Sequence, residues 1–274
     1  MSGLGALVRA ASLDRYIATL FAPEHKREAL FSLYAFDTEI DHIRDVVHDP
    51  LPGELRLQWW RDVVNGERDG EARGHPVAAA LLHSIEAHGL PRSAFDAYCE
   101  ARIFDFYQDE MPDQTALEAY LGSTKSAILQ LAAMVLDGDS ARSASDAAGH
   151  AGVAQGVVLI LQQQLHRRGQ LFIPANILAA AGLSPESLKR GEDLKGLKRS
   201  VAAMSALAQH HLDEFRAHSG SIDACLAPAF LPIAVVPRSL RLMEDKIDFS
   251  KPPRTPSPFM QIWDIFRAAV HRGD

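Results

Sequence analysis

The stretch that decides the fold is residues 24–47, EHKREALFSLYAFDTEIDHIRDVV. Apolar side chains recur along it at three- and four-residue steps: Leu33, Phe36, Ile40, Ile43 and Val47. This period places them in one stripe along a helix. Pro23 stands just before the stretch and Asp49-Pro50 just after it, as expected at the start and end of a helix. The stretch therefore predicts one long helix with a buried face.

The same periodicity continues along the chain, and short clusters of Gly, Pro, Ser and Asp interrupt it. We expect further helices over residues 54–66, 76–88, 91–108, 114–136, 145–168, 194–218, 230–246 and 258–271. The connections are short, and we find neither a fixed-period repeat nor a low-complexity segment in the sequence. We therefore predict an all-α fold in a single domain over residues 1–274.

Composition limits the classes of protein to be considered. A chain of 274 residues with 47% hydrophobic content buries a sizeable core. The 35 acidic and 28 basic residues give a formal charge of −7, which argues against sequence-independent binding of nucleic acid. Cys99 and Cys225 lie far apart and form no CxxC pair, and the first residues lack the basic start of a secretory signal. We expect a cytoplasmic, reducing location.

Three acids follow one another at four-residue steps on the first helix: Asp37, Asp41 and Asp45. We call them the aspartate rail. Neighbouring carboxylates about 6 Å apart repel by roughly 3 kcal/mol at an effective dielectric of about 20, so something should neutralise them. A bridging Mg²⁺ would do so. From spacing alone we favour the other solution, a solvated face on which Arg44 pairs with Asp41.

Several motifs resemble those of the squalene/phytoene synthase family. The resemblance is carried by residues 15–23 (RYIATLFAP), 26–36 (KREALFSLYAF), Asp41-x-x-x-Asp45, Trp59-Trp60-Arg61, His75-Pro76-Val77 and 167–174 (RRGQLFIP), and it spans roughly residues 13–245. It implies the isoprenoid synthase-type helical bundle with a central, partly apolar cavity.

The resemblance also implies a site. In that family, two aspartate-rich motifs on facing helices hold Mg²⁺ ions that grip two prenyl diphosphates, which then condense head to head in terpenoid biosynthesis. Asp41 and Asp45 match the metal ligands of the first motif, and Asp37 is an additional acid for the same catalytic site. The residues that the resemblance assigns to substrate binding are Tyr34, Gln162, Arg167 and Arg168.

The second aspartate motif is missing from the sequence. Its helix should lie just before Arg167, but it carries Gln155, Gln162, Gln163 and Gln164 instead, and no Asp or Glu occurs from residue 147 to 185. Glutamine coordinates a metal ion only through a neutral carbonyl oxygen. In this the chain resembles the branch of the superfamily that contains a mitochondrial complex I assembly factor, which keeps the bundle and acts without prenyl transfer.

Three functions remain open at this point. The first is a non-catalytic or weakly catalytic pseudoenzyme in respiratory complex I assembly, with complex I subunits as partners, peripheral contact with the inner membrane and no cofactor. The second is a Mg²⁺-dependent prenyl transferase. The third is a protein that binds a prenyl diphosphate or another lipophilic ligand in the cavity. Whether the chain is an enzyme depends on which of these holds.

Two other groups of polar residues are notable. His210 and Glu214 share a predicted helix face, but the sequence offers no third metal ligand beside them, so we interpret them as part of a polar surface. Glu39-x-x-His42 matches half of a di-iron motif, and the other half is missing from the sequence.

Overall fold

Helix α3 (Glu24–Val46) forms the predicted first helix and is buried from Ala29 through Asp37. The computed structural model describes residues 3–47, 49–107, 109–164, 171–184, 187, 193–245 and 254–270. Within these ranges the chain contains helices and no strand, which confirms the all-α prediction. The order of elements is α1 (Gly3–Ala11), α2 (Leu13–Leu20), α3, α4 (Pro50–Asn65), α5 (Asp69–Ala72), α6 (Pro76–His88), α7 (Arg92–Arg102), η1 (Ile103–Phe106), α8 (Gln114–Leu121), η2 (Gly122–Ser126), α9 (Ala127–Leu136), η3 (Ser140–Arg142), α10 (Ser145–Gln164), α11 (Ala175–Ala180), α13 (Leu194–Ser219), η4 (Ala224–Leu226), α14 (Ala227–Phe230), η5 (Leu231–Val235), α15 (Val236–Asp245) and α16 (Pro258–Val270).

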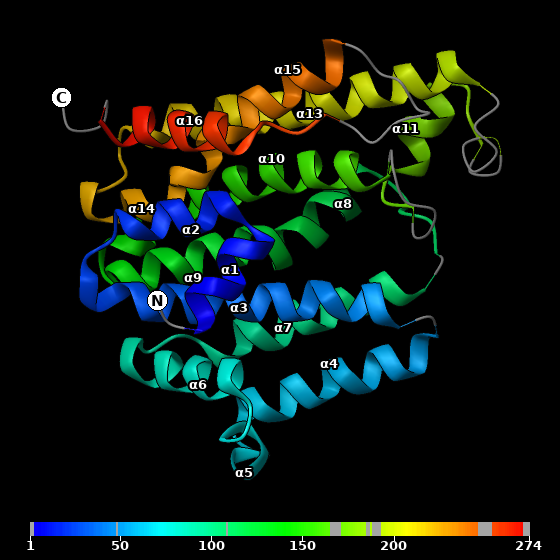
Figure 1. Ribbon diagram of the computed structural model, residues 1–274. Coiled ribbons are helices and arrows are strands. Elements are labelled where there is room, and N and C mark those ends of the chain that lie inside the picture. Colours follow the sequence, from blue (N-terminus) through cyan, green and yellow to red (C-terminus); the bar gives the residue numbers. More distant parts are fainter. Residues whose placement is uncertain are drawn as a thin grey trace.

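The helices stack in layers around α3 and α10 (Figure 1). Helix α3 packs against α1, α6 and α9, while α10 packs against α13 and α9. Helices α4, α5 and α6 form one side of the bundle, and α13, α15 and α16 form the opposite side (Figure 1). The long helices run roughly along one direction, so side chains from α3 and α10 approach the same interior space.

Most predicted helices are present, with three local differences. The stretch 114–136 is α8 and α9 joined by η2, a π-helical turn. The stretch 230–246 begins with short 3₁₀ and α turns, because Pro228 and Pro232 lack the backbone N–H that a continuous helix needs. The short helices α1, α2, α5 and α11 were not predicted. Each has only 4 to 9 residues, too few to give a clear periodic pattern.

Two segments, Gln114–Leu136 and Ala224–Met243, are long and apolar enough to cross a membrane by length and composition. In each of them, 61% of the most apolar window is buried inside the bundle. Core packing therefore accounts for their hydrophobicity.

The π-helical turn η2 meets α10 at a very close backbone approach. Ser126 Oγ donates a hydrogen bond to the Gly149 carbonyl oxygen at 2.8 Å. One turn later, a Cβ added to Gly152 would lie 2.3 Å from Ser126 Cα and 2.3 Å from Ser126 N. Only glycine permits this contact, and it sets the distance between η2 and the helix that faces α3 across the interior.

We expect Gly152→Ala to destabilise the protein by about 3 kcal/mol, because the added methyl group overlaps backbone atoms that cannot move independently. Gly149→Ala is the matched control, since nothing lies within 4 Å of its added Cβ. It should be neutral or stabilising by up to about 1 kcal/mol through helix propensity. Urea unfolding of both variants measures the difference. Equal stabilities would contradict the close approach.

Candidate functional site

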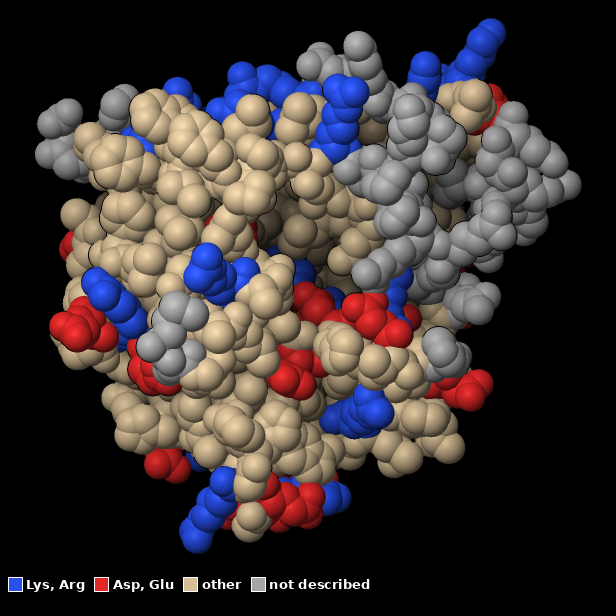
Figure 2. Space-filling model, viewed as in Figure 1, with Lys and Arg blue, Asp and Glu red and all other residues tan. Residues whose placement is uncertain are grey.

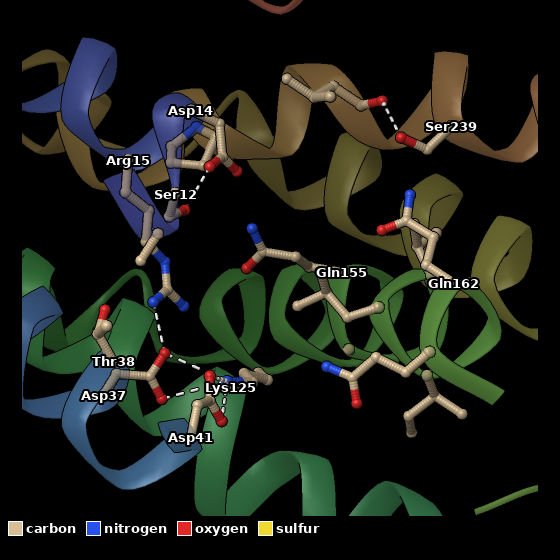
Figure 3. Close-up of a pocket in the computed structure, with 18 of the residues that line it drawn as sticks. Ser12, Asp14, Arg15, Asp37, Thr38, Asp41, Lys125, Gln155, Gln162 and Ser239 are labelled. Atoms are coloured by element: carbon tan, nitrogen blue, oxygen red, sulfur yellow. Dashed lines mark hydrogen bonds and ion pairs between the residues drawn. The ribbon is translucent and has the colours of Figure 1, made fainter. Parts of the chain in front are cut away.

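A cavity of about 630 Å³ lies between α3 and α10 and is lined by polar and apolar residues in similar measure. This volume suits a small-molecule ligand. The aspartate rail lines one wall, and Gln155 and Gln162 of α10 line the other (Figure 3). Arg15 of α2 and Lys125 of η2 also line it. The cavity therefore collects the aspartate rail and the two glutamines that the sequence singled out, together with cations that it did not: Arg15, Arg102 and Lys125.

The three rail acids differ sharply in exposure. Asp37 is completely buried, Asp41 is half-buried, and Asp45 is exposed. All three line the cavity. The structure thus brings the predicted catalytic and metal-binding residues to one wall, but with three different environments.

Cations from other helices neutralise the two inner acids. Lys125 Nζ lies 3.1 Å from Asp37 Oδ1 and 3.1 Å from Asp41 Oδ2, so one ammonium group bridges both carboxylates (Figure 3). The Arg15 guanidinium donates to Asp37 Oδ2, and the Arg102 guanidinium donates to Asp41 Oδ1. These charge-assisted contacts supply the compensation that the rail needs.

A third carboxylate completes the network. Arg102 Nε lies 3.1 Å from Asp105 Oδ2, and the Tyr120 hydroxyl donates to Asp105 Oδ1 at 2.6 Å. Three carboxylates (Asp37, Asp41 and Asp105) thus face three cations (Arg15, Arg102 and Lys125). Among these six groups the formal charge is zero without any added ion. We call them the six-residue charge network.

The charges around Asp37 control its protonation. Burial alone would raise the pKa of Asp37, but Lys125, Arg15 and a hydrogen bond from the Tyr98 hydroxyl together hold it well below its usual range. Burial also raises the pKa of Tyr98 and of Tyr120 well above the ordinary value. Asp37 is therefore ionised and both phenols are neutral donors at neutral pH.

The pairing that we favoured from sequence is wrong. The Arg44 guanidinium lies over the Phe172 ring, 5.2 Å from its centroid, while Arg102 and Lys125 are the cations on Asp41. Nor is the inner rail a solvated face, since Asp37 is buried. Contacts with other helices determine both the partners of Asp41 and the burial of Asp37. A four-residue spacing within one helix does not reveal such contacts.

The wall opposite the rail is neutral. Gln155 is only 5% exposed, and its Oε1 has no hydrogen-bond partner among the described residues. It points into the cavity (Figure 3). Gln162 is half-buried on the same wall. A cluster of Mg²⁺ ions needs carboxylates on both walls, whereas here one wall is uncharged and the other already holds protein cations. The residues present do not fit such a cluster.

The other predicted substrate-binding residues have different positions. Tyr34 is buried outside the set of residues that line the cavity, and the Arg15 guanidinium lies 5.2 Å from its ring centroid. Burial raises the pKa of Tyr34 to about 12. Arg167 and Arg168 lie outside the described residues.

The sequence analysis did not predict three of the residues at this site: Arg15, Arg102 and Lys125. Arg15 begins a stretch that carries the family resemblance, and this was an available signal. Arg102 and Lys125 stand in no motif, and only the packing of α7 and η2 against α3 brings them to the rail.

The tryptophan and histidine motifs have structural roles. Arg61 Nε donates to Asp96 at 2.7 Å and Arg61 Nη1 to Glu100 at 2.7 Å, which ties α4 to α7. His75 Nδ1 accepts from the Ala78 N–H and caps α6. Trp59, Trp60 and His75 line a smaller cavity of about 240 Å³ together with Glu39 and His42.

The sequence profile described as squalene/phytoene synthase matches residues 8–260. The chain belongs to the squalene/phytoene synthase family. Within this family, the protein named complex I assembly factor 6 from Bos taurus is 28% identical over 259 residues, which cover 90% of this chain and 77% of the relative. A presqualene diphosphate synthase from Sinorhizobium fredii is 28% identical over 205 residues, 73% of this chain and 71% of the relative.

Solved structures of family members share the architecture. A dehydrosqualene synthase in complex with ligand superposes with a TM-score of 0.75 at 14% identity, covering 98% of this chain and 95% of that one. The squalene synthase of Alicyclobacillus acidocaldarius gives a TM-score of 0.68 at 21% identity, covering 88% and 91%. These matches confirm the isoprenoid synthase-type bundle.

We expect Asp37→Asn to lower the free energy of unfolding by about 3–5 kcal/mol at neutral pH, because it leaves Arg15 and Lys125 buried with less compensating charge. Asp45→Asn, on the same helix but exposed, should cost less than about 1 kcal/mol. Urea denaturation of the two variants checks this. A cost for Asp37→Asn as small as for the control would show that the network contributes little.

The same variant tests the pH dependence. Because the pKa of Asp37 is lowered in the folded state, its ionised form contributes stability above the unfolded pKa of about 4, and this stability is lost as the pH falls toward the folded value. Wild-type stability should therefore fall below about pH 4 more steeply than that of Asp37→Asn. Unfolding curves between about pH 7 and pH 3 measure both slopes, and parallel slopes would contradict the role assigned to Asp37.

Proposed function

We propose that this squalene/phytoene synthase-family protein does not transfer prenyl groups and acts in the assembly of respiratory complex I. The observation that carries the proposal is the six-residue charge network. It balances the inner aspartates with protein cations, in the place where the family's catalysis requires metal ions.

Electrostatics supports the loss of catalysis. A Mg²⁺ ion between Asp37 and Asp41 would have to displace Lys125, whose side chain is only 9% exposed. Separating a buried cation from its partners costs several kcal/mol. On the opposite wall, Gln155 and Gln162 offer no charge to a second ion. The bridging Lys125 and the uncharged glutamines both disfavour the binding of Mg²⁺. All of these residues lie on helical segments of the bundle.

The relatives support the second part of the proposal. Those named complex I assembly factor 6 from cattle, human, rat and mouse align over 89–90% of this chain. The two presqualene diphosphate synthases align over 70–73% of it. In these sequence alignments, the mammalian relatives named for assembly therefore match more of this chain than the presqualene diphosphate synthases do.

The preserved cavity favours an accompanying role in ligand binding. It combines apolar side chains of α10 and η5, such as Val158, Leu159 and Val235, with the unpartnered Gln155 Oε1. A lipophilic ligand with a polar end that donates a hydrogen bond suits this lining. Such a ligand would occupy the cavity without being consumed.

Helix α16 carries an exposed apolar face that is suited to contact with a membrane surface. Five of its large apolar residues face outward in one stripe: Phe259, Ile262, Trp263, Phe266 and Val270 are 41–75% exposed. In Figure 2 the surface over this helix is largely uncharged. On the inward side, Ile265 is buried in a small apolar cluster with Ala18 and Leu231. Asp264, also inward, accepts two hydrogen bonds of 2.6 Å from Arg238. A stripe of large apolar side chains left exposed on the outer side marks an interaction surface.

We infer that this stripe lies in the interfacial region of an anionic lipid bilayer. Tryptophan and phenylalanine on one face of a helix are typical of such contact. The only acid of α16, Asp264, is buried and paired, whereas Arg267 on the helix and Arg254 before it are exposed. The charges that remain exposed there therefore complement anionic lipid. This would place the protein peripherally at the membrane in which complex I is assembled.

Incubation of the purified protein with farnesyl and geranylgeranyl diphosphate plus Mg²⁺ should give no condensation product, because the Mg²⁺ ligand set is incomplete. A presqualene diphosphate synthase assayed in parallel shows that the assay works, and product analysis by mass spectrometry gives the readout. Turnover that Asp45→Asn abolishes would contradict the proposal.

Deletion of the gene should lower NADH:ubiquinone oxidoreductase activity in membranes, and Asp45→Asn protein should restore it as well as wild type does. Asp45 matches a family metal ligand but is exposed here, so the variant should fold normally. If complex I activity is unchanged after the deletion, the proposed assembly role is wrong. This holds even if the chain has no transferase activity.

The membrane contact is tested by co-sedimentation with vesicles of phosphatidylcholine and phosphatidylglycerol. The double variant Trp263→Glu and Phe266→Glu should weaken binding at least tenfold, since it charges the centre of the apolar stripe. Leu55→Glu is the control, because Leu55 is 62% exposed on α4 at the opposite side of the bundle. Equal binding by both variants would exclude α16 as the contact.

A further inference from the structure

A second cluster of chemically active side chains lies where α10 packs against α13. His150 comes from α10, and Glu214 and His218 come from α13, one helical turn apart. One ligand atom from each residue lies within 4.8 Å of the other two. All three side chains are half-buried, and none lines the cavity described above. The cluster is therefore separate from the family site.

Hydrogen bonds orient the ring of His150. His211 Nε2 lies 3.2 Å from Glu118 Oε1, and His211 Nδ1 lies 2.9 Å from His150 Nδ1. A carboxylate only accepts, so Nε2 of His211 carries the proton that it donates to Glu118. When His211 is neutral, its Nδ1 then accepts a hydrogen bond from the Nδ1–H of His150. This leaves the lone pair on His150 Nε2 available to a ligand.

His218 is oriented in the same way. Its Nδ1 lies 2.7 Å from the backbone carbonyl oxygen of Glu214, which can only accept, so Nδ1 carries the proton and Nε2 carries the lone pair. Metal-bound histidines in proteins generally donate their second ring N–H to a carboxylate or a backbone carbonyl. Here His218 donates directly to a carbonyl, and His150 reaches the Glu118 carboxylate through His211. Both rings already have their outer hydrogen bonds.

We propose that His150, Glu214 and His218 bind a divalent transition metal ion, with Zn²⁺ the best match, and that water completes its coordination. Two imidazole nitrogens and one carboxylate oxygen form a ligand set that Zn²⁺ adopts when one position stays open. Zinc–ligand bonds of about 2.0–2.2 Å bring ligand atoms to roughly 3–3.5 Å of one another. Because these atoms now lie within 4.8 Å of one another, the half-buried side chains close by at most about 1.8 Å on binding.

The ion joins α10 to α13 and stabilises that helix pair. Ligands from both helices are brought together only in the folded chain, so binding adds to folding stability. Burial and the neighbouring His211 lower the pKa of His150, which keeps its imidazole neutral, as a metal ligand must be. His211 and Glu118 are positioning residues, because they act on the metal through His150.

The sequence indicated only part of this cluster. His210, which shares a predicted face with Glu214, is exposed and lies edge-on to the His211 ring. The third ligand comes from α10, more than 60 residues earlier in the chain. We interpreted this region as a polar face and did not predict the ligand His150. Sequence spacing shows which residues are neighbours on one helix, but not which residues the partner helix brings beside them.

The test uses the full chain without a histidine tag, stripped of metal with EDTA and titrated with Co²⁺. Wild type should take up one equivalent, with the visible absorption of four-coordinate Co²⁺, which one equivalent of Zn²⁺ then displaces. Zn²⁺ should also raise the melting temperature. Glu214→Gln and His218→Ala should each weaken binding more than 100-fold, whereas His211→Phe should weaken it about 10- to 100-fold.

His210→Ala is the matched control, since it removes an exposed imidazole from the same helix and should leave affinity unchanged. Melting temperatures in EDTA show whether each variant is folded, and Glu214→Gln is nearly isosteric. The proposal is overturned if wild type binds no Co²⁺ or binds it only with a six-coordinate spectrum. It is also overturned if folded Glu214→Gln and His218→Ala bind as tightly as His210→Ala.

Discussion

The ammonium group of Lys125 between Asp37 and Asp41 is the contact on which the interior of this protein depends. Two carboxylates one helical turn apart, one of them fully buried, require positive charge close by, and Lys125 supplies it from another helix. Its segment, η2, also forms the close approach to Gly152 of α10. One π-helical turn therefore sets both the charge balance of the rail and the position of the wall opposite it.

The proposed function implies that this chain keeps the family fold without prenyl transfer. The helices, the cavity and the rail are all present, and the chain belongs to a family with relatives named as synthases. The chain itself provides the compensating charge of the aspartate rail through side chains that also hold the helices together, so residues that line the cavity contribute to the core.

Sequence reasoning was strongest where information is local. The stripe from Leu33 to Val47 predicted α3 closely, and the missing acids between residues 147 and 185 predicted the neutral wall carrying Gln155. It failed where two helices must meet. The partner of Asp41 was predicted as Arg44, a neighbour on the same helix, whereas packing supplies Arg102 and Lys125. The outward-facing apolar stripe of α16 was not predicted for the same reason, because periodicity shows which residues share a face but not the side that the face is on.

The bridging position of Lys125 also constrains how this site could change over evolutionary time. Restoring carboxylates at Gln155 and Gln162 would add negative charge to a cavity in which Asp37 and Asp41 are already neutralised, and would not free them for a metal ion. Removing Lys125 first would leave Asp37 and Asp41 short of positive charge, which is destabilising on its own. A metal-binding pocket would therefore require substitutions on both walls of the cavity, and one of them, the removal of Lys125, is destabilising on its own.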